Sequence, residues 1–594
     1  MGAEDDRARP AVSDPKATAP AGDSASKEAL KRLRKELADA RATQAALPHL
    51  NAALAAMGAN QFERGMKACR KALKADPNNV FGHHLLAIAH EKMGDWAASI
   101  DSYEKALALK PDSPEIANDL GRLAFQMQMY PQAEALFRLH LAARPHAPES
   151  SNNLACVLRE QMRYEEAIDI LKPAIQGAPD RVILWNTLGT IMADLGETEQ
   201  SAIFYTETLR LDPRHVKARY NRANALFTMG DTETAIADCR SAMLATESPK
   251  EKATMGLALS SMLLASGDLP QGWEAYEARL SPDFHDPIHF LINRPQWTPF
   301  EDIDGKHLLL VGEQGLGDEV LFANVLDDVI DALGPGGRLS VAVDRRLVPL
   351  LQRSFPRAHF GVHNTFKRNI RNIRSVPWIT DWADVDCWAP MGQPLRQFRL
   401  SLDAFPDRPQ GFLRADPDRV AYWREQFAGA QGPLVGLVWT SMIINSSRKK
   451  YFSPFDRWGP ILQTPGATFV NLQYGDRTED IEMARREFGV EILQPQGIDL
   501  KMDLDDVAAL SCAMDLVLGP ANATSNLSAA CGVPTWLIST PGAWTQLGTD
   551  RYPWYSQVRM FSSKTFGDWD PVIAEIAQAL GEFVGQGTRA AVAG

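Results

Sequence analysis

One glycine-rich loop of the chain carries acidic residues that could act as a general base. The loop reads VGEQGLGDE, and Asp318 follows Gly317 directly within it. Transfer of a group to an alcohol requires that one proton be removed, and a single carboxylate can remove it. We therefore take Asp318 as the candidate catalytic base, with Glu313 and Glu319 as its local competitors. An Asp near a helix start is also a good cap, so a structural role for Asp318 stays open beside the catalytic one.

The glycines of this loop argue against a nicotinamide cofactor. Gly312, Gly315 and Gly317 form a G-x-x-G-x-G pattern. Dinucleotide-binding folds carry G-x-G-x-x-G at the same junction between a strand and a helix. The spacing therefore favours another kind of ligand.

A second set of polar residues follows an expected strand over 434–439. The sequence there continues through hydroxyl-bearing residues to a triplet of cations, Arg448-Lys449-Lys450. Hydroxyls, amides and cations at the carboxyl end of a strand suit the phosphate of a nucleotide. A solvated loop is the alternative for the cations. The candidate donor-binding residues of this set are Trp439, Thr440, Ser441, Arg448 and Lys449.

A third set lies in the segment GPANATSNLSAACGVPTW. Gly519-Pro520 follows an expected strand, and Asn522 stands where a helix is expected to begin. The free backbone N–H groups of a helix start, with the positive end of the helix dipole, favour an anion. The candidate donor-binding residues here are Asn522, Thr524, Ser525 and Asn526.

Composition and motifs exclude several classes of protein. The net charge of −12 argues against nucleic acid, whose phosphates require a basic face. The six cysteines are scattered, which fits a reducing cytoplasm better than secretion. We expect neither a signal peptide nor a membrane span, because no long apolar run is present. Asp384-x-Asp386 is the one D-x-D pattern considered for a metal, and we interpret it as surface, so no metal site is expected.

The second half of the chain has the pattern of a parallel α/β fold. Short apolar runs alternate with helical stretches, and strands are expected over 307–311, 338–343, 434–439, 468–473, 516–518 and 535–539. This order predicts two Rossmann-like lobes, 303–410 and 411–585. A substrate cleft is expected between them, at the carboxyl ends of their strands.

The first half has a repeat. Prolines recur at a spacing of 34 residues and once of 36, at Pro77, Pro111, Pro145, Pro179, Pro213 and Pro249. Such a period predicts stacked helical hairpins, each closed by a proline that cannot continue its second helix. Small residues such as Gly121 and Gly189 recur where the two helices of a hairpin must touch. These residues resemble the tetratricopeptide repeat (TPR), which implies an α-helical superhelix with a concave groove.

Asparagines recur in the first helices of the repeats, on the expected concave side. A row of carboxamides can pair with the backbone of an extended peptide whatever its side chains. A similar ladder occurs in the nucleocytoplasmic O-GlcNAc transferases, which the row resembles. Solvent-exposed polar residues are the alternative interpretation. The candidate acceptor-protein-binding residues are Asn118, Asn152, Asn153, Asn186 and Asn221.

The α/β half resembles glycosyltransferases of the GT-B type. The loop ending at Asp318 and the segment around Asn522 resemble those of TPR-linked glycosyltransferases, as does the aromatic segment at Tyr552-Pro553-Trp554-Tyr555. In that family an acid after a glycine pair points into the cleft, and the resemblance adds Gly315 and Gly317 to the donor-binding set. The family's usual Asp-Thr pair and His are replaced by Ala521, Asn522 and Asn526, which indicates a different donor.

Repeats and lobes together resemble the bacterial TPR glycosyltransferases that O-glycosylate flagellin. The resemblance implies a cytoplasmic enzyme, needed for flagellum assembly. It would bind flagellin and transfer a nonulosonic acid of the pseudaminic or legionaminic type from a CMP-linked donor to Ser or Thr. The donor is a substrate, and no cofactor is expected. The alternatives are an O-GlcNAc-type transferase with a UDP-sugar, a non-catalytic TPR adaptor, and an enzyme of surface polysaccharide assembly.

The expected domain organisation follows from these elements. It comprises a disordered N-terminus (1–27), a helical cap (28–48), the TPR repeats (49–282), a connector (283–302), two GT-B-like lobes (303–410 and 411–585) and a flexible tail (586–594).

Overall fold

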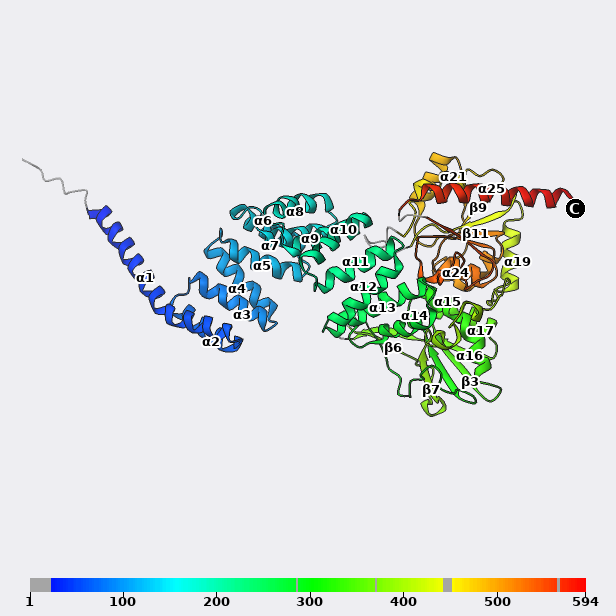
Figure 1. The fold of residues 1–594 in the computed structure, drawn as a ribbon, viewed down its shortest axis with the longest axis horizontal. Helices are drawn as coiled ribbons and strands as arrows, with labels where there is room; N and C mark the ends of the chain where they lie inside the picture. The colour runs from blue at the N-terminus through cyan, green and yellow to red at the C-terminus, as the bar shows by residue number, and fades with distance from the viewer. Residues whose placement is uncertain (1–22, 285–286, 369–370, 442–450, 564–566, 594) are drawn as a thin grey trace, which may run out of the picture. The chain divides into compact units, whose positions relative to one another are not determined.

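The protein consists of two compact units, each with its own helical hairpins. A computed structural model describes residues 23–284, 287–368, 371–441, 451–563 and 567–593 (Figure 1). The first unit is Met1–Ala178 and the second is Pro179–Gly594. The boundary falls at the fourth of the regularly spaced prolines.

The first unit is built from helices that pair in sequence order. Pro77, Pro111 and Pro145 follow the ends of the second helices of its hairpins, as the repeat predicts. The helices are α1 (Asp23–Gly58), α2 (Phe62–Ala75), α3 (Val80–Lys92), α4 (Trp96–Leu109), α5 (Pro114–Gln126), α6 (Tyr130–Ala143), α7 (Pro148–Glu160) and α8 (Tyr164–Gly177).

The beginning of this unit differs from the expectation of a separate cap. The predicted cap and the first helix of the first repeat form one helix, α1, which continues through Pro48. Proline removes one backbone hydrogen bond from a helix interior. Burial of Ala46, Leu50 and Ala53 against α2 offsets that loss, because these residues form a small core with Cys69 and others.

The second unit begins with further hairpins of the same kind. Its first helices are α9 (Val182–Leu195), α10 (Thr198–Leu211), α11 (Val216–Thr228), α12 (Thr232–Ala245), α13 (Pro249–Ala265) and α14 (Leu269–Tyr276). Within the α9–α10 hairpin, a Cβ atom at Gly189 would lie 2.8 Å from the Tyr205 ring, so the small residue permits the close approach. Pro249 departs from the predicted pattern. It begins α13, where its missing N–H leaves no bond unmade, rather than closing α12.

Two parallel sheets follow the hairpins of the second unit. The first has the order β4 (Ala358–Val362), β3 (Arg338–Val343), β2 (His307–Val311), β7 (Cys387–Pro390). Residues 307–311 are buried throughout, as expected of a strand covered on both faces. Helices α15 (Leu316–Phe322), α16 (Leu326–Ala332) and α17 (Val348–Ser354) belong to this lobe.

The second sheet has six strands, all paired in parallel. Its order is β10 (Ile492–Leu493), β9 (Thr468–Asn471), β8 (Leu434–Leu437), β11 (Leu516–Pro520), β12 (Thr535–Ser539), β13 (Val558–Ser562). In chain order this reads 3-2-1-4-5-6, the arrangement of doubly wound nucleotide-binding folds. The crevice outside the neighbouring strands β8 and β11 is the expected ligand position in such a sheet.

Further helices accompany this second lobe. They are α19 (Pro417–Gln426), α21 (Gly459–Leu462), α22 (Thr478–Met483), α23 (Leu504–Cys512), α24 (Ala523–Ala530) and α25 (Asp570–Ala593), whereas α18 (Leu395–Phe398) belongs to the first lobe. Helix α25 continues past residue 585, where the second lobe was expected to end, into the segment expected to be a tail.

The sequence patterns miss a small third sheet. Strand β6 (Arg371–Ser375) pairs in parallel with β1 (Ile288–Phe290) and antiparallel with β5 (Asn364–Arg368). Strand β5 is exposed along its length, so it lacks the apolar alternation that identifies most strands. Strand β1 lies in the predicted connector, which is therefore part of the folded lobe.

One hydrophobic core crosses the predicted domain boundaries. It contains Trp273 of α14, Leu308 of β2 and Leu527 of α24. The Trp273 indole N–H donates to the carbonyl of Arg399 at 2.8 Å, and its ring meets Trp544 and Trp554 edge to face. The last hairpin and the two lobes are thus packed together as one body within the second unit.

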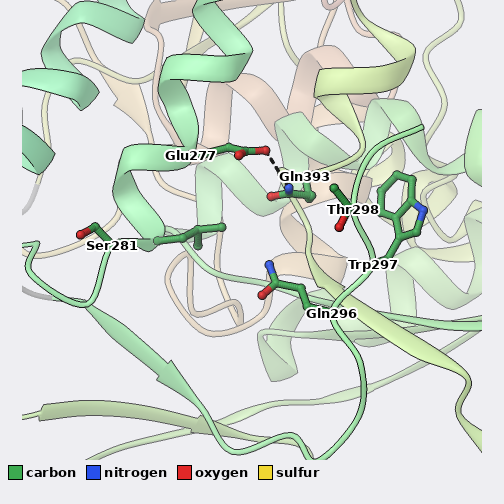
Figure 2. A pocket seen from close by; sticks show the side chains of 7 residues that line it. Glu277, Ser281, Gln296, Trp297, Thr298 and Gln393 are labelled. Atoms are coloured by element: carbon green, nitrogen blue, oxygen red, sulfur yellow. Dashed lines mark hydrogen bonds between the residues drawn. The ribbon is translucent and has the colours of Figure 1, made fainter. Parts of the chain in front are cut away.

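The connector and the last hairpin form the walls of a pocket together. Trp297 is buried and pins the segment to the first lobe, where its backbone N–H donates to Trp388 at 2.8 Å. The pocket has a volume of about 400 Å³ and lies between residues 277–281 and 296–298 (Figure 2). None of the residues predicted from the sequence to form a site lines it.

Candidate functional site

Asp318 lies at the start of the helix that follows β2. Gly315 is the N-cap of α15, and its N–H donates to Asp318 Oδ2 at 3.2 Å. The capping role considered from the sequence takes a different form, because Gly315 is the N-cap and Asp318 accepts its N–H from position N3. Burial raises the pKa of Asp318 to about 6, and the nearby carboxylates of Glu313 and Glu319 act in the same direction. Such a pKa leaves the carboxylate ionised at neutral pH and more basic than an ordinary Asp.

The competitor Glu313 is committed to a buried ion pair. Its two oxygens accept from Nε and Nη2 of Arg279 at 2.8 and 2.9 Å, and Oε1 also accepts from the Gly392 N–H at 2.8 Å. Both side chains are only 3% exposed. Burial lowers the pKa of Arg279, but Glu313, Tyr276 and Glu277 together more than offset it, so the net pKa lies above the ordinary value. Glu313 is therefore held as a structural anion.

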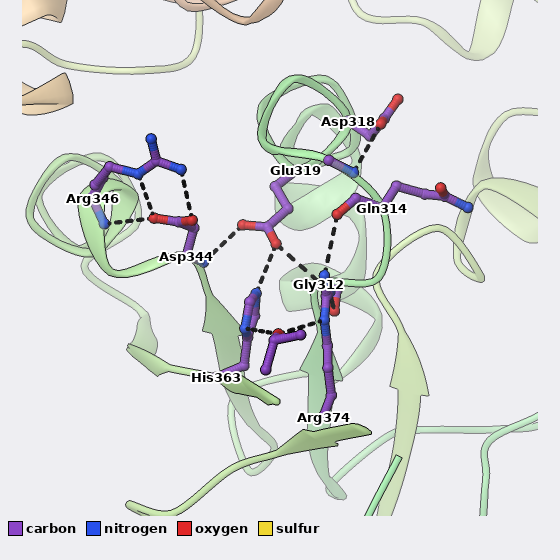
Figure 3. A network of polar contacts seen from close by, with 10 residues as sticks. Gly312, Gln314, Asp318, Glu319, Asp344, Arg346, His363 and Arg374 are labelled. Carbon is purple, nitrogen blue, oxygen red and sulfur yellow. Dashed lines mark hydrogen bonds and ion pairs between the residues drawn. The ribbon is translucent and has the colours of Figure 1, made fainter. Parts of the chain in front are cut away.

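The competitor Glu319 is enclosed by a polar network (Figure 3). It accepts from the Asp344 backbone N–H at 2.8 Å and lies 2.9 Å from Nε2 of His363. Its side chain folds beneath Gly312, where a Cβ atom would lie 2.2 Å from Glu319 Oε1. Of the acidic side chains in the loop, Asp318 is the one that forms no ion pair with another described residue, and it accepts from the Gly315 backbone N–H.

Arg374 is a site residue that sequence reasoning missed. It comes from β6, is buried, and donates through Nη1 to the Gly312 carbonyl and through Nη2 to the Gln314 carbonyl at 3.2 Å (Figure 3). Burial lowers its pKa. The guanidinium therefore fixes the backbone of the loop that carries Asp318. No motif marks it, because it reaches the loop from a strand 62 residues further along the chain.

On the second lobe, Trp439 belongs to the core. Its ring stacks on Phe455 with centroids 4.7 Å apart, and its indole N–H donates to Asp480 at 2.8 Å. The backbone N–H groups of Trp439 and Thr440 both donate to Oε1 of Gln473, at 3.0 and 2.9 Å. The side chain of Trp439 therefore fixes the end of β8. Thr440, the next residue, is buried.

Ser441 adjoins a cation that the sequence analysis did not single out. Arg477 Nη2 contacts the Ser441 carbonyl at 3.4 Å, and its buried Nε has no hydrogen-bond partner among the described residues. Arg448 and Lys449 lie outside the described residues. Within the described part of this lobe, Arg477 is therefore a cation placed beside the candidate donor residues.

The start of α24 is closely bonded to the end of β8. Asn522 caps the helix by accepting from the Ser525 N–H at 3.1 Å, and its Nδ2 contacts the Thr440 carbonyl at 3.4 Å. Asn526 donates to the Asn522 carbonyl at 2.9 Å and accepts from the Tyr552 hydroxyl at 3.0 Å. Thr524 and Ser525 are buried, and Ser525 Oγ has no partner among the described residues.

The candidate residues of the two lobes come together at one place. A Cβ atom at Gly317 would lie 3.5 Å from the backbone N and Cα of Ala523. The loop before Asp318 therefore meets the start of α24, which Asn522 caps. Residues predicted separately from two distant segments are thus neighbours.

The asparagines of the repeats are divided between the units. Asn118, Asn152 and Asn153 lie in the first unit, where Asn118 Oδ1 accepts from the Ser150 hydroxyl at 3.0 Å and Asn152 is buried. Asn186 and Asn221 lie in the second unit, and the buried Oδ1 of Asn186 has no partner among the described residues. Peptide binding by this row stays a prediction.

The described residues hold no cluster of three or more His, Cys, Asp or Glu side chains that could bind a metal. Asp384 pairs with Arg338, and Asp386 accepts from the His307 backbone N–H at 2.7 Å. Among the helices of the described part, none is long and apolar enough to span a bilayer.

Comparison with known proteins identifies the repeats and the family. Models of the tetratricopeptide repeat match residues 48–79, 84–148 and 204–237. Protein FlbA of Caulobacter vibrioides is 47% identical over 563 residues, which cover 95% of this chain and 94% of that protein. The chain belongs to the FlbA family. The peroxisomal targeting signal receptor of Candida albicans is 38% identical to this chain over 63 residues. These residues cover 11% of this chain and 11% of that protein.

Solved structures match over parts of the FlbA-family chain. A tetratricopeptide repeat protein from Parabacteroides merdae covers 39% of this chain and 91% of its own, with a TM-score of 0.35 and 16% identity. YrrB, described as a TPR protein with an unusual peptide-binding site, covers 30% of this chain and 93% of its own, with a TM-score of 0.26 and 19% identity.

Proposed function

We propose that this protein is a GT-B-type protein O-glycosyltransferase of the cytoplasm. It would bind flagellin through its repeats and transfer a nonulosonic acid from a CMP-linked donor to Ser or Thr. Membership of the FlbA family supports a flagellum-related role. The observation that carries the catalytic part is the position of Asp318, whose basic carboxylate adjoins the start of α24 while Glu313 and Glu319 are engaged elsewhere.

In the proposed reaction the first lobe supplies the base that accepts the proton, and the second lobe holds the leaving nucleotide. The acceptor hydroxyl oxygen forms a bond to the anomeric carbon of the sugar, and the bond from that carbon to the phosphate oxygen breaks. The leaving CMP takes the electron pair, and Asp318 takes the hydroxyl proton. A pKa of about 6 suits this task, because the base is ionised at neutral pH and still attracts a proton.

The leaving phosphate gains negative charge in this step and needs a positive partner. Arg477 supports the assignment of that role to the second lobe, since its guanidinium contacts Ser441 and its Nε has no partner among the described residues. A charge-assisted hydrogen bond to phosphate is stronger than one between neutral groups. The polar end of β8 and the Asn522 cap would hold the nucleotide at the crevice between β8 and β11.

Intact-mass measurement of flagellin tests the proposal. Purified full-length protein, flagellin and a CMP-linked nonulosonic acid should give a mass increase of one sugar residue, and Asp318→Asn should abolish it. Asp331→Asn, an exposed carboxylate of α16, is the matched control and should leave transfer unchanged. Transfer from a UDP-sugar only, or no transfer from any donor, would contradict the proposal.

A further inference from the structure

The pocket beside the connector is lined by both polar and apolar side chains, and none of these lining residues is a cation. Its walls include Glu277 and Ser281 from the last hairpin, Gln296 and Thr298 from the connector, and Gln393 from the first lobe (Figure 2). Glu277 is neutralised by Arg396, to which it is bonded. A phosphate or nucleotide would find no free cation among these lining residues, so the pocket suits an uncharged ligand.

Gln393 lines this pocket, and its enclosed side-chain oxygen has no partner among the described residues, so a donor can reach it once the amide turns toward the pocket. Its side chain is 5% exposed, and its Nε2 donates to Glu277 Oε1 at 2.9 Å. Its Oε1 is buried and has no hydrogen-bond partner among the described residues. A buried acceptor without a partner is unfavourable. The pocket is therefore suited to a ligand that brings an N–H or O–H donor.

Gln296 presents unused backbone groups to the same pocket. The connector pairs with β7 in parallel at this point: Trp297 N–H donates to Trp388 at 2.8 Å, and Trp388 N–H donates to Pro295 at 3.0 Å. In a parallel pair of this register, the N–H and C=O of the residue between the two bonds face away from the sheet. Gln296 thus offers a donor and an acceptor at an open edge, as receptors of extended peptides do.

We propose that this pocket binds an extended, uncharged polypeptide segment that bears Ser, Thr or Asn. The segment adds a strand to the connector by pairing with the N–H and C=O of Gln296, and one of its side chains donates to Gln393 Oε1. The proposal rests on the proposed function in one respect, because it assigns the segment to the acceptor protein.

The position of the pocket fits delivery of an acceptor to the catalytic loop. Gln393 follows Gly392, whose N–H donates to Glu313 at 2.8 Å. Glu313 in turn belongs to the loop that ends at Asp318. The pocket and the loop are therefore linked through one hydrogen bond, from the residue beside Gln393 to the buried Glu313.

Binding of short synthetic peptides to the full-length protein tests the proposal without any sugar donor. An array of uncharged peptides with a central Ser, Thr or Asn supplies the probe, and fluorescence polarisation measures affinity. Gln296→Pro removes the outward N–H while the bonds made by Pro295 and Trp297 remain. It should weaken binding about tenfold or more, since a hydrogen bond is lost and the ring obstructs the edge.

Matched variants separate the backbone from the side chains. Gln296→Ala keeps the backbone groups and should change affinity by less than about threefold. Gln393→Leu removes the acceptor and should weaken binding of peptides with a central Ser more than peptides with a central Ala. Asp331→Asn should bind as the natural protein does.

The results that would overturn the proposal are distinct. They are equal affinity of Gln296→Pro and Gln296→Ala, failure of every peptide on the array to bind, or displacement of bound peptide by a free hexose. Peptide binding to this pocket without any sugar transfer would contradict the proposed function and support the proposed peptide site. A sugar-transfer rate that Gln296→Pro does not change would contradict the peptide site and leave the proposed function standing.

Discussion

Similar carboxylates within one loop have different surroundings and therefore different uses. Glu313 is paired with Arg279, and Glu319 is enclosed by His363 and the backbone of Asp344. Asp318 is bonded to one N–H and is left with a raised pKa. At the residue scale, the choice of a base is decided by which carboxylates have structural partners.

The sequence predicts that Asp318 stabilises the start of a helix, but it predicts neither its position at N3 nor this division of roles. A cap is a local feature, since its partner Gly315 lies three residues away. The partners of the two glutamates come from segments 34 and 44 residues away. Arg279 and His363 carry no motif, so nothing in the sequence connects them with the loop.

Asp318→Asn should separate stability from catalysis. The folded protein keeps the Asp318 proton up to about pH 6, whereas the unfolded chain loses it near the ordinary value of 3.8. The folded state therefore binds more protons in that window, and the free energy of unfolding falls as pH rises through it. Asparagine removes this dependence and should stabilise the protein by about 1–3 kcal/mol at neutral pH. Thermal unfolding on either side of the window measures it.

The sugar-transfer rate of the natural protein should fall as pH drops through about 6, because the base becomes protonated. An asparagine variant that is less stable at neutral pH, or a rate that is flat through this window, would contradict the assignment.

At the scale of elements, the hairpins depend on small residues where two helices meet. Gly189 of α9 lies directly against the Tyr205 ring of α10. The 34-residue period and these small residues are local signals, so the hairpins are predictable from sequence. The sheet β1-β6-β5 is not, because its strands are short and partly exposed, and the pairing of β1 with β6 joins segments more than 80 residues apart.

Gly189→Ala should lower the stability of the second unit by about 1–3 kcal/mol, since the new methyl group collides with an aromatic ring that has little room to move. Gly581→Ala in α25 is the matched control. Its Cβ meets no atom within 4 Å, so the helix gains about 1 kcal/mol from the better propensity of alanine. Unfolding midpoints compare the two variants. Equal midpoints would show that the hairpin relaxes without loss.

At the scale of the whole chain, the repeat pattern and the compact units have different boundaries. The repeats predict a domain from 49 to 282, yet α9 to α14 belong to the unit that contains both parallel sheets. Periodicity reports how helices pair with their neighbours in sequence. It carries no information on which hairpins share a core with the lobes, and Trp273 does so through residues more than a hundred positions away.

Two fragments test this organisation. Residues 179–594 contain the complete second unit and should fold cooperatively. Residues 303–594 follow the boundary predicted from sequence but lack Arg279, which leaves Glu313 as an unpaired buried carboxylate, and they also lack Trp273. Loss of the ion-pair partner alone should destabilise this fragment by about 3–5 kcal/mol. Urea unfolding compares them, and equal stability would contradict the shared core.

The union of the last hairpin with the lobes has an evolutionary consequence. Hairpins gained or lost ahead of Pro179 alter the reach of the array and leave the Arg279–Glu313 pair untouched. An insertion between Pro249 and Ser281 would separate Arg279 from Glu313 and move Trp273 away from its contacts in the core. Lineages of this family should therefore vary in repeat number at the amino-terminal end and hold the final hairpin constant.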